Sequence, residues 1–183
     1  MDYREEICRY LPADEQERSE QEAVLHLMET FPDNLLTREN VVAHFTGSAI
    51  ILNPQRDKTL MVFHNLYQSW SWTGGHADGD PDLLAVAERE AREETGIAEL
   101  TPVSRQILSL DILPVWGHWK KGRFVAGHLH LSAAYGFVAQ ENQPLKNLPE
   151  ENSAVAWLPV EQLERYVTEP QMLPIYRKIM NRF

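Results

Sequence analysis

The chain has 183 residues, of which 43% are hydrophobic and 24% are charged, and its formal net charge is −10 at pH 7. This length and composition are typical of one globular domain with a sizeable core. The negative charge argues against a broad grip on a nucleic acid polymer or an anionic membrane, because both partners require clustered Lys and Arg.

The cysteine content and the N-terminal segment bear on location. Cys8 is the only cysteine in the sequence, so an internal disulfide and a cysteine-rich zinc site are both excluded. Residues 1–22 are acidic and lack the apolar centre of a signal peptide. No apolar run approaches the roughly 20 residues that span a bilayer. We therefore expect a cytoplasmic protein that has no membrane or nucleic acid partner.

Residues 1–40 are expected to form an N-terminal helical extension packed on the main domain. Pro12 and Asp14 begin a predicted helix that runs to about Phe31 and ends before a Pro-Asp-Asn sequence. The apolar stripe of this helix consists of Ala23, Val24, Leu27 and Met28.

Residues 41–183 are expected to form the main domain. Two β-rich runs, 43–53 and 59–65, flank the turn-forming sequence NPQRDK and predict a hairpin. Further strands are predicted at 69–75, 104–116, 122–140 and 153–159, and helices at Pro81 to about Thr95, Val160–Tyr166 and Gln171–Asn181. This mixed order of strands and helices predicts a layered α/β or α+β domain.

The sequence REAREETGI, residues 89–97, ends the strongest of the predicted helices. Asp80 is expected to be its N-cap and Pro81 its first residue, where the missing N–H of proline costs nothing. Gly96 is expected to terminate the helix.

One face of this helix combines apolar and acidic side chains. At about 100° per residue, one stripe consists of Leu83, Ala87, Glu90 and Glu94. Glu93 lies at its edge, whereas Glu88 and Arg92 point to water. Two carboxylates one turn apart repel each other, and partial burial increases the cost. A divalent cation would neutralise both charges, but the helix alone leaves a solvated acidic face open as the alternative.

The run from Gly75 to Ile97 resembles the signature of the Nudix hydrolases, in which a glycine precedes Arg-Glu-apolar-x-Glu-Glu-x-Gly-apolar at fixed spacing. The residues in register are Gly75, Arg89, Glu90, Ala91, Glu93, Glu94, Gly96 and Ile97. The order of strands and helices is similar over about residues 42–168. Six residues after the signature glycine the family has a glutamate, whereas this chain has Pro81.

The resemblance implies a Nudix-type α/β/α sandwich with a mixed β-sheet. It also implies hydrolysis of a nucleoside diphosphate linked to another moiety, with Mg²⁺ or Mn²⁺ as the cofactor. The metal ligands of the family map onto Glu90 and Glu94, with Glu93 in the same cluster and a backbone carbonyl at or near Gly75. Homodimers are common among relatives, and the resemblance extends that expectation to this chain.

Pyrophosphate hydrolysis requires a base as well as a cation. In the family this base lies either in the signature helix or in a downstream loop, so Glu93 and Glu151 are both candidates. For Glu151 a solvated loop acid is the alternative. Arg89 is one turn from Glu93 and is expected to orient that carboxylate.

Several histidines are candidate substrate contacts. His128 and His130 alternate along a predicted strand and therefore face the same side of the sheet, where they could bind phosphate or a transition metal. His118 lies in the preceding loop, and His76 follows the signature glycine. The alternative is a polar sheet face without a ligand.

Trp72 is one of several tryptophans in or near the predicted loops. An indole can stack on a nucleobase, so Trp72 is a further candidate for substrate binding. Its position within a short strand also allows a place in the core.

Two other functions follow from the same fold. A nucleotide-sensing Nudix-like module without catalysis usually loses the paired glutamates; this chain retains them, and Pro81 keeps the alternative open. Isopentenyl-diphosphate isomerase requires a cysteine in the sheet region, whereas Cys8 lies in the N-terminal segment, so that activity is excluded.

Overall fold

The computed structural model describes residues 2–120 and 122–183. Among them, eight strands form one sheet with the order β10-β2-β1-β9-β5, to which β3, β4 and β6 add by pairing with β2, β1 and β9. The strands are β1 (Ala43–Leu52), β2 (Lys58–His64), β3 (Ser69–Ser71), β4 (Thr73–His76), β5 (Thr101–Pro102), β6 (Ser109–Val115), β9 (His128–Val138) and β10 (Asn152–Pro159).

The sheet is mixed, as predicted. β1 runs parallel to β9 along its whole length and antiparallel to β2 and β4. Every residue of β1 is buried, because helices cover both faces of the sheet. The predicted hairpin is formed by β1 and β2, in which Ile51 is paired with Leu60.

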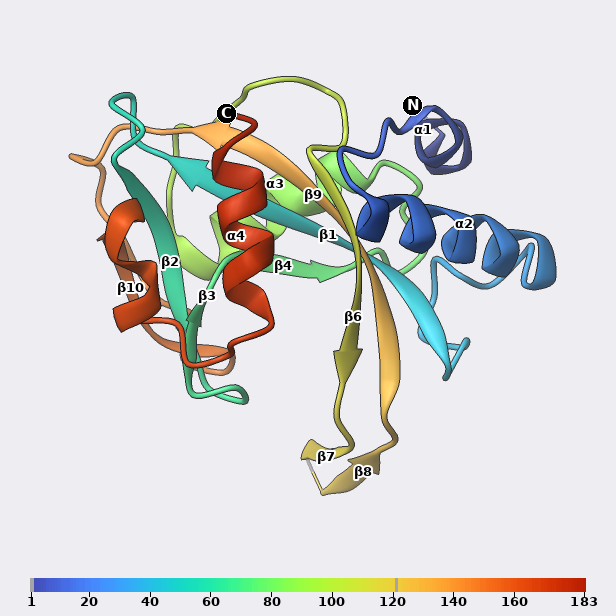
Figure 1. The fold of residues 1–183 in the computed structure, drawn as a ribbon. Helices are drawn as coiled ribbons and strands as arrows, with labels where there is room; N and C mark the ends of the chain where they lie inside the picture. The colour runs from blue at the N-terminus through green and yellow to red at the C-terminus, as the bar shows by residue number, and fades with distance from the viewer. Residues whose placement is uncertain (1, 121) are drawn as a thin grey trace.

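Two helices enclose the sheet in an α/β/α arrangement. α3 (Leu83–Thr95) lies behind the sheet and α4 (Met172–Met180) in front of it in Figure 1. A Cβ atom at Gly47 of β1 would lie 2.5 Å from the backbone oxygen of Leu83, so this glycine allows α3 to approach closely. On the other face, Ile50 and Leu52 of β1 pack in a second core with α4. The predicted fold class is therefore confirmed.

The N-terminal segment contains two helices, α1 (Tyr3–Arg9) and α2 (Glu15–Thr30). α2 has the predicted position, and the Asp14 side chain caps it by accepting a hydrogen bond from the backbone N–H of Glu17. The sequence analysis did not predict α1. Both helices contribute to the same core as the sheet, through Tyr3, Ile7, Val24 and Met28 among others.

The start of α3 differs from the prediction. The helix begins at Leu83, and its N-cap is Asp82, whose side chain accepts a hydrogen bond of 3.1 Å from the backbone N–H of Ala85. Asp80 accepts a hydrogen bond of 3.0 Å from the backbone N–H of Asp82, which places Pro81 in the turn before the helix. The prediction of Asp80 as N-cap was therefore wrong by two residues. Gly96 ends the helix with φ +70°, as expected.

The second half of the chain contains more and shorter strands than predicted. A hairpin of β7 (His118–Lys120) and β8 (Arg123–Val125) projects from the main sheet at the bottom of Figure 1. A 3₁₀ helix (Val160–Arg165) and α4 account for the two predicted C-terminal helices. No helix among the described residues is both long and apolar enough to cross a bilayer.

Candidate active site

The acidic face of α3 lies against the glycines of β4. Glu94 is only 2% exposed, and its Oε1 atom accepts a hydrogen bond of 2.8 Å from the backbone N–H of Gly74. Glu90 is half-buried, and a Cβ atom at Gly75 would lie 2.4 Å from its carboxylate Oε2. A larger residue at position 75 would therefore have to displace the Glu90 side chain, so the signature glycine leaves space for this carboxylate in its observed position.

Burial and like charges perturb both carboxyl groups. Burial raises the pKa of Glu94 to about 8; the Gly74 hydrogen bond opposes this shift, and the charges of Glu151, Glu90 and Glu93 add to it. Burial also raises the pKa of Glu90, with Arg89 acting against the shift and Glu93 and Glu151 acting with it. Four carboxylates therefore act on one another here, and a positive charge would stabilise the ionised forms.

Arg89 does not contact the carboxylate expected from the sequence. Its guanidinium lies 3.3 Å from Glu90 Oε1 and 3.4 Å from Asp80 Oδ2. The side chain thus joins the helix to the preceding turn and orients Glu90 rather than Glu93. Glu93, one turn away, is exposed.

Glu151 lies in the turn that precedes β10, and its neighbour Asn152 ties this turn to α3. The buried Asn152 side chain donates a hydrogen bond of 3.1 Å to the backbone oxygen of Glu94 and accepts one of 3.2 Å from the backbone N–H of Leu148. Glu151 itself is exposed. The sequence analysis did not single out Asn152, because a lone asparagine at a strand start carries no distinguishing pattern.

Four histidines gather on three neighbouring strands. Their candidate ligand atoms, on His44, His76, His128 and His130, all lie within 4.8 Å of one another. His44 is paired with His130 between β1 and β9, and His76 is paired with Thr46 between β4 and β1. His76, His128 and His130 were predicted from the sequence as candidate contacts, whereas His44 was not, because only the strand register brings it close to them.

Burial disfavours the charged form of these imidazoles. Together with the neighbouring histidines, burial lowers the pKa of His76 to about 4 and that of His130 to about 2. Burial lowers the pKa of His44 as well, although the hydrogen bond to Asn40 opposes that shift. At neutral pH these three rings are uncharged, which is the form that binds metals.

The two remaining candidates lie elsewhere. His118, on β7, is outside the histidine group and lines a groove of about 380 Å³ together with Trp116 and Tyr67. Trp72 packs its indole edge-on against Tyr176 of α4, with ring centroids 5.4 Å apart, and its backbone N–H donates to the Tyr176 hydroxyl. Its indole is thus half-buried beside the second core.

The residues on the α3 side suit Mg²⁺ or Mn²⁺. Glu90, Glu93, Glu94 and the Gly75 backbone offer hard oxygen atoms, which these ions prefer. The buried Glu94 carboxyl, with its raised pKa, marks a position that favours a nearby cation. Among the described residues, however, it is the ligand atoms of the four histidines that all lie within 4.8 Å of one another. The carboxylate oxygen atoms on the α3 side are therefore farther apart than the histidine nitrogen atoms.

A mixed α/β/α sandwich with a carboxylate-bearing helix against a glycine strand is the architecture of the Nudix hydrolases. Residues 43–183 match the family model of the NUDIX domain. The chain therefore belongs to the NUDIX domain family and is a hydrolase of that class. None of the curated proteins matches it.

Solved structures share the fold at low sequence identity. A NUDIX family hydrolase from Clostridium perfringens has 19% identity and a TM-score of 0.53, with 75% of this chain and 96% of that one covered. A C. elegans Ap4A hydrolase has 17% identity, a TM-score of 0.53, and 75% and 95% covered. The E. coli dihydroneopterin triphosphate pyrophosphohydrolase has 13% identity, a TM-score of 0.56, and 76% and 96% covered.

Proposed function

We propose that this chain hydrolyses a pyrophosphate bond in a nucleoside diphosphate linked to another moiety, with Mg²⁺ or Mn²⁺ as the cofactor. The observation that carries the proposal is the buried Glu94, whose pKa is raised to about 8 beside Glu90, Glu93 and Glu151. Membership of the NUDIX family supports a pyrophosphohydrolase-type reaction. Enclosing a carboxylate among three others costs free energy, and that cost is offset when a cation binds there.

In this proposal Glu90 and Glu94 hold the cation, joined by Glu93 and the backbone carbonyl of Gly75. When bound, the cation shields the charge of the diphosphate and lowers the pKa of water. Arg89 keeps the Glu90 carboxylate in place through its 3.3 Å contact.

A carboxylate must accept a proton from the attacking water. We assign this role to Glu151, with Glu93 as the second candidate. The charges of both residues act on Glu90 and Glu94, and the turn that carries Glu151 is tied to α3 through Asn152. The exposed position of Glu151 leaves its carboxylate accessible to substrate and water.

For the rest of the substrate we propose contacts in the groove beside β7. His118 lines this groove, and Trp116 beside it is 78% exposed, so its indole is available to stack on a base. Trp72, whose indole packs on Tyr176, lies outside the lining of this groove and is kept as a separate candidate contact. We also propose a cytoplasmic location, which the single free cysteine, Cys8, supports. The last part of the proposal is that the chain forms a homodimer.

The test is a screen of nucleoside diphosphate compounds with Mg²⁺ and with Mn²⁺, scored by release of phosphorylated products. The screen also includes Ap4A and dihydroneopterin triphosphate, because these compounds appear in the names of two hydrolases with a similar fold. Glu94→Gln retains an oxygen for the Gly74 N–H and should keep the fold. It should lower turnover by at least about 100-fold, because a lost metal ligand forfeits several kcal/mol of charge stabilisation.

The control is Glu88→Gln, which changes a carboxylate paired with Arg92 at 2.7 Å on the outer side of the same helix. This variant should turn over like the wild type. Full activity of Glu94→Gln would contradict the metal assignment. Nucleotide binding by the wild type without hydrolysis of any compound would favour the non-catalytic sensing module.

A further inference from the structure

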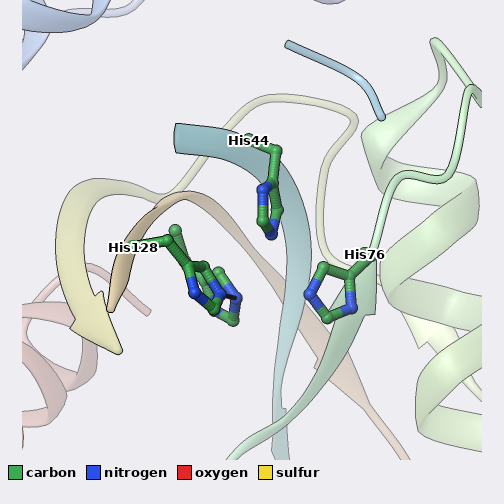
Figure 2. Close-up of side chains that lie close together, drawn as sticks. His44, His76 and His128 are labelled. Carbon is green, nitrogen blue, oxygen red and sulfur yellow. Dashed lines mark hydrogen bonds between the residues drawn. The ribbon is translucent and has the colours of Figure 1, made fainter. Parts of the chain in front are cut away.

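The ligand atoms of the four histidines lie within 4.8 Å of one another, and one pair has the separation that a tetrahedral metal ion requires. The Nε2 atoms of His128 and His130 are 3.3 Å apart. Two ligands of a tetrahedral ion with metal–nitrogen bonds of roughly 2.0–2.1 Å are also about 3.3 Å apart. The rings of His44 and His76 lie 5.0 Å from each other and 5.3 and 4.9 Å from that of His130, measured between centroids. Figure 2 shows His44, His76 and His128 directed toward one common space.

His44 supplies an independent sign of a missing partner. Its side chain is only 4% exposed, and its Nε2 atom is buried without any hydrogen-bond partner. A buried polar atom without a partner costs roughly 1–3 kcal/mol. A hydrogen bond between His128 and His130 would pair their Nε2 atoms and still leave His44 Nε2 unsatisfied, whereas a metal ion between the four rings would engage that atom as well.

In two of the four histidines, His44 and His128, the opposite ring nitrogen is held as it is in metal sites. Nδ1 of His44 donates to the backbone oxygen of Asn40 at 3.1 Å, and Nδ1 of His128 donates to that of Ala126 at 2.9 Å. Because a carbonyl oxygen accepts only, each Nδ1 carries the proton and each Nε2 presents a lone pair. This outer hydrogen bond fixes the tautomer and the ring orientation of metal-binding histidines.

The histidine group is separate from the acidic site. The register pairs Gly47 with Gly75 and Thr46 with His76, and Cβ atoms at either glycine would meet α3. Since adjacent residues of a strand point to opposite faces, His76 points away from α3 and its glutamates. The two groups therefore lie on opposite faces of β4.

We propose that His44, His76, His128 and His130 form a second metal site that binds one divalent transition metal ion of the zinc class. Four imidazole nitrogens suit Zn²⁺ and its neighbours in the transition series, whereas Mg²⁺ prefers oxygen. Four protein ligands fill a tetrahedral shell and leave no position for a substrate atom. The ion thus joins β4 to β1 and β9 and steadies the strand that carries Gly75, and the histidines serve the metal rather than the substrate.

The experiment uses the full chain without a polyhistidine tag, stripped by a chelator and titrated with Co²⁺ and then Zn²⁺. The wild type should bind one equivalent of Co²⁺ with the intense visible absorption of a four-coordinate site, and Zn²⁺ should displace it and raise the unfolding temperature. His44→Ala and His130→Ala should each weaken binding by more than about 100-fold, because an outer hydrogen bond alone is worth roughly 10–100-fold.

Two controls separate this site from the acidic one and from folding defects. His26→Ala alters an exposed histidine of α2 and should bind Co²⁺ like the wild type. The double variant Glu90→Gln/Glu94→Gln should lose hydrolysis and keep the Co²⁺ spectrum. Circular dichroism of the metal-free variants checks that each is folded. The proposal is overturned if the wild type lacks the intense four-coordinate Co²⁺ absorption, or if that absorption survives both histidine substitutions or vanishes in the glutamate double variant.

Discussion

At the scale of single residues, the three glutamates on the acidic face of α3 differ in how far they are exposed to solvent, and this difference indicates their roles. Glu94 is enclosed, Glu90 is half-buried and Glu93 is exposed. A buried acid with a raised pKa suits ligation of a cation, whereas an exposed acid can meet water and substrate. The base is therefore sought among the exposed carboxylates, Glu93 and Glu151.

Substitution of Glu151 should reveal the base. Glu151→Gln removes the proton acceptor but keeps the turn, because Asn152 still bonds to the backbone of Glu94. We expect turnover to fall by roughly 10²–10⁴-fold with little change in KM. Steady-state measurement of kcat and KM for the variant and the wild type checks this.

Glu150→Gln is the matched control one residue earlier in the same turn, and Glu93→Gln tests the second candidate. A larger loss of turnover in Glu93→Gln than in Glu151→Gln, with Glu150→Gln unchanged, would move the role of the base to α3.

The sequence predicted the residues that share one helix but not those that different strands bring together. Fixed spacing identified Glu90, Glu93 and Glu94, and a 3.6-residue period correctly placed Glu94 inward. His44 was missed because its link to His130 depends on the parallel register of β1 and β9, which are more than 70 residues apart. The roles of the predicted site residues stay predictions.

At the scale of elements, the start of α3 decides how the acidic face is presented. Helix termini leave backbone N–H groups without partners, and Asp82 satisfies that of Ala85. The sequence DGDPD offers more than one aspartate as a cap, and proline after Asp80 favoured the earlier one. In the structure the N-cap is Asp82, because its side chain accepts the hydrogen bond from the Ala85 N–H. The preference of proline for the first position of a helix does not decide where α3 begins.

Removal of this cap should lower stability. Asp82→Ala should reduce the free energy of unfolding by about 1 kcal/mol, because an N-cap hydrogen bond is lost. Urea unfolding of the variant and the wild type measures the difference. Asp82→Asn retains a capping oxygen and should recover most of the loss. If Asp80→Ala cost more than Asp82→Ala, the cap assignment would be wrong.

Long periodic elements were predicted and short ones were not. α2 and α3 carry several turns of apolar periodicity, so their existence was evident. α1 has only 7 residues and β5 only 2, too few to show a period. The predicted strand at 122–140 divides into β8 and β9, because the former leaves the main sheet to pair with β7.

At the scale of the whole molecule, a buried ionic network joins the N-terminal segment to the rest. Glu17 of α2 has a fully buried side chain, and its carboxylate lies 3.0 Å from Lys178 Nζ and 2.5 Å from the Arg182 guanidinium. Lys178 also contacts Asp111 of β6 at 2.6 Å. α2, β6 and the C-terminal region are thus tied together. We therefore propose that residues 1–40, although outside the family match, form an extension that stabilises the domain.

Because of this network, the free energy of unfolding should depend on pH in the acidic range. Burial by itself would raise the pKa of Glu17, but hydrogen bonds from Arg182, Ala13, Tyr10 and Lys178 outweigh it and lower the pKa to about 2. A group whose pKa is lower in the folded state stabilises the fold above its unfolded pKa of about 4.5. That contribution is lost as the pH falls from about 4.5 toward 2.

Glu17→Gln should therefore lower the free energy of unfolding near pH 7 by roughly 3 kcal/mol, because Arg182 and Lys178 lose a buried partner. The difference from the wild type should shrink as the pH approaches 2, where Glu17 takes up a proton in the wild type as well. Urea unfolding at a series of pH values measures both effects. Glu15→Gln, in an exposed pair with Arg18, should change stability by less than about 1 kcal/mol. A Glu17→Gln deficit that stayed constant down to pH 2 would show that packing, rather than the charge of Glu17, holds the extension in place.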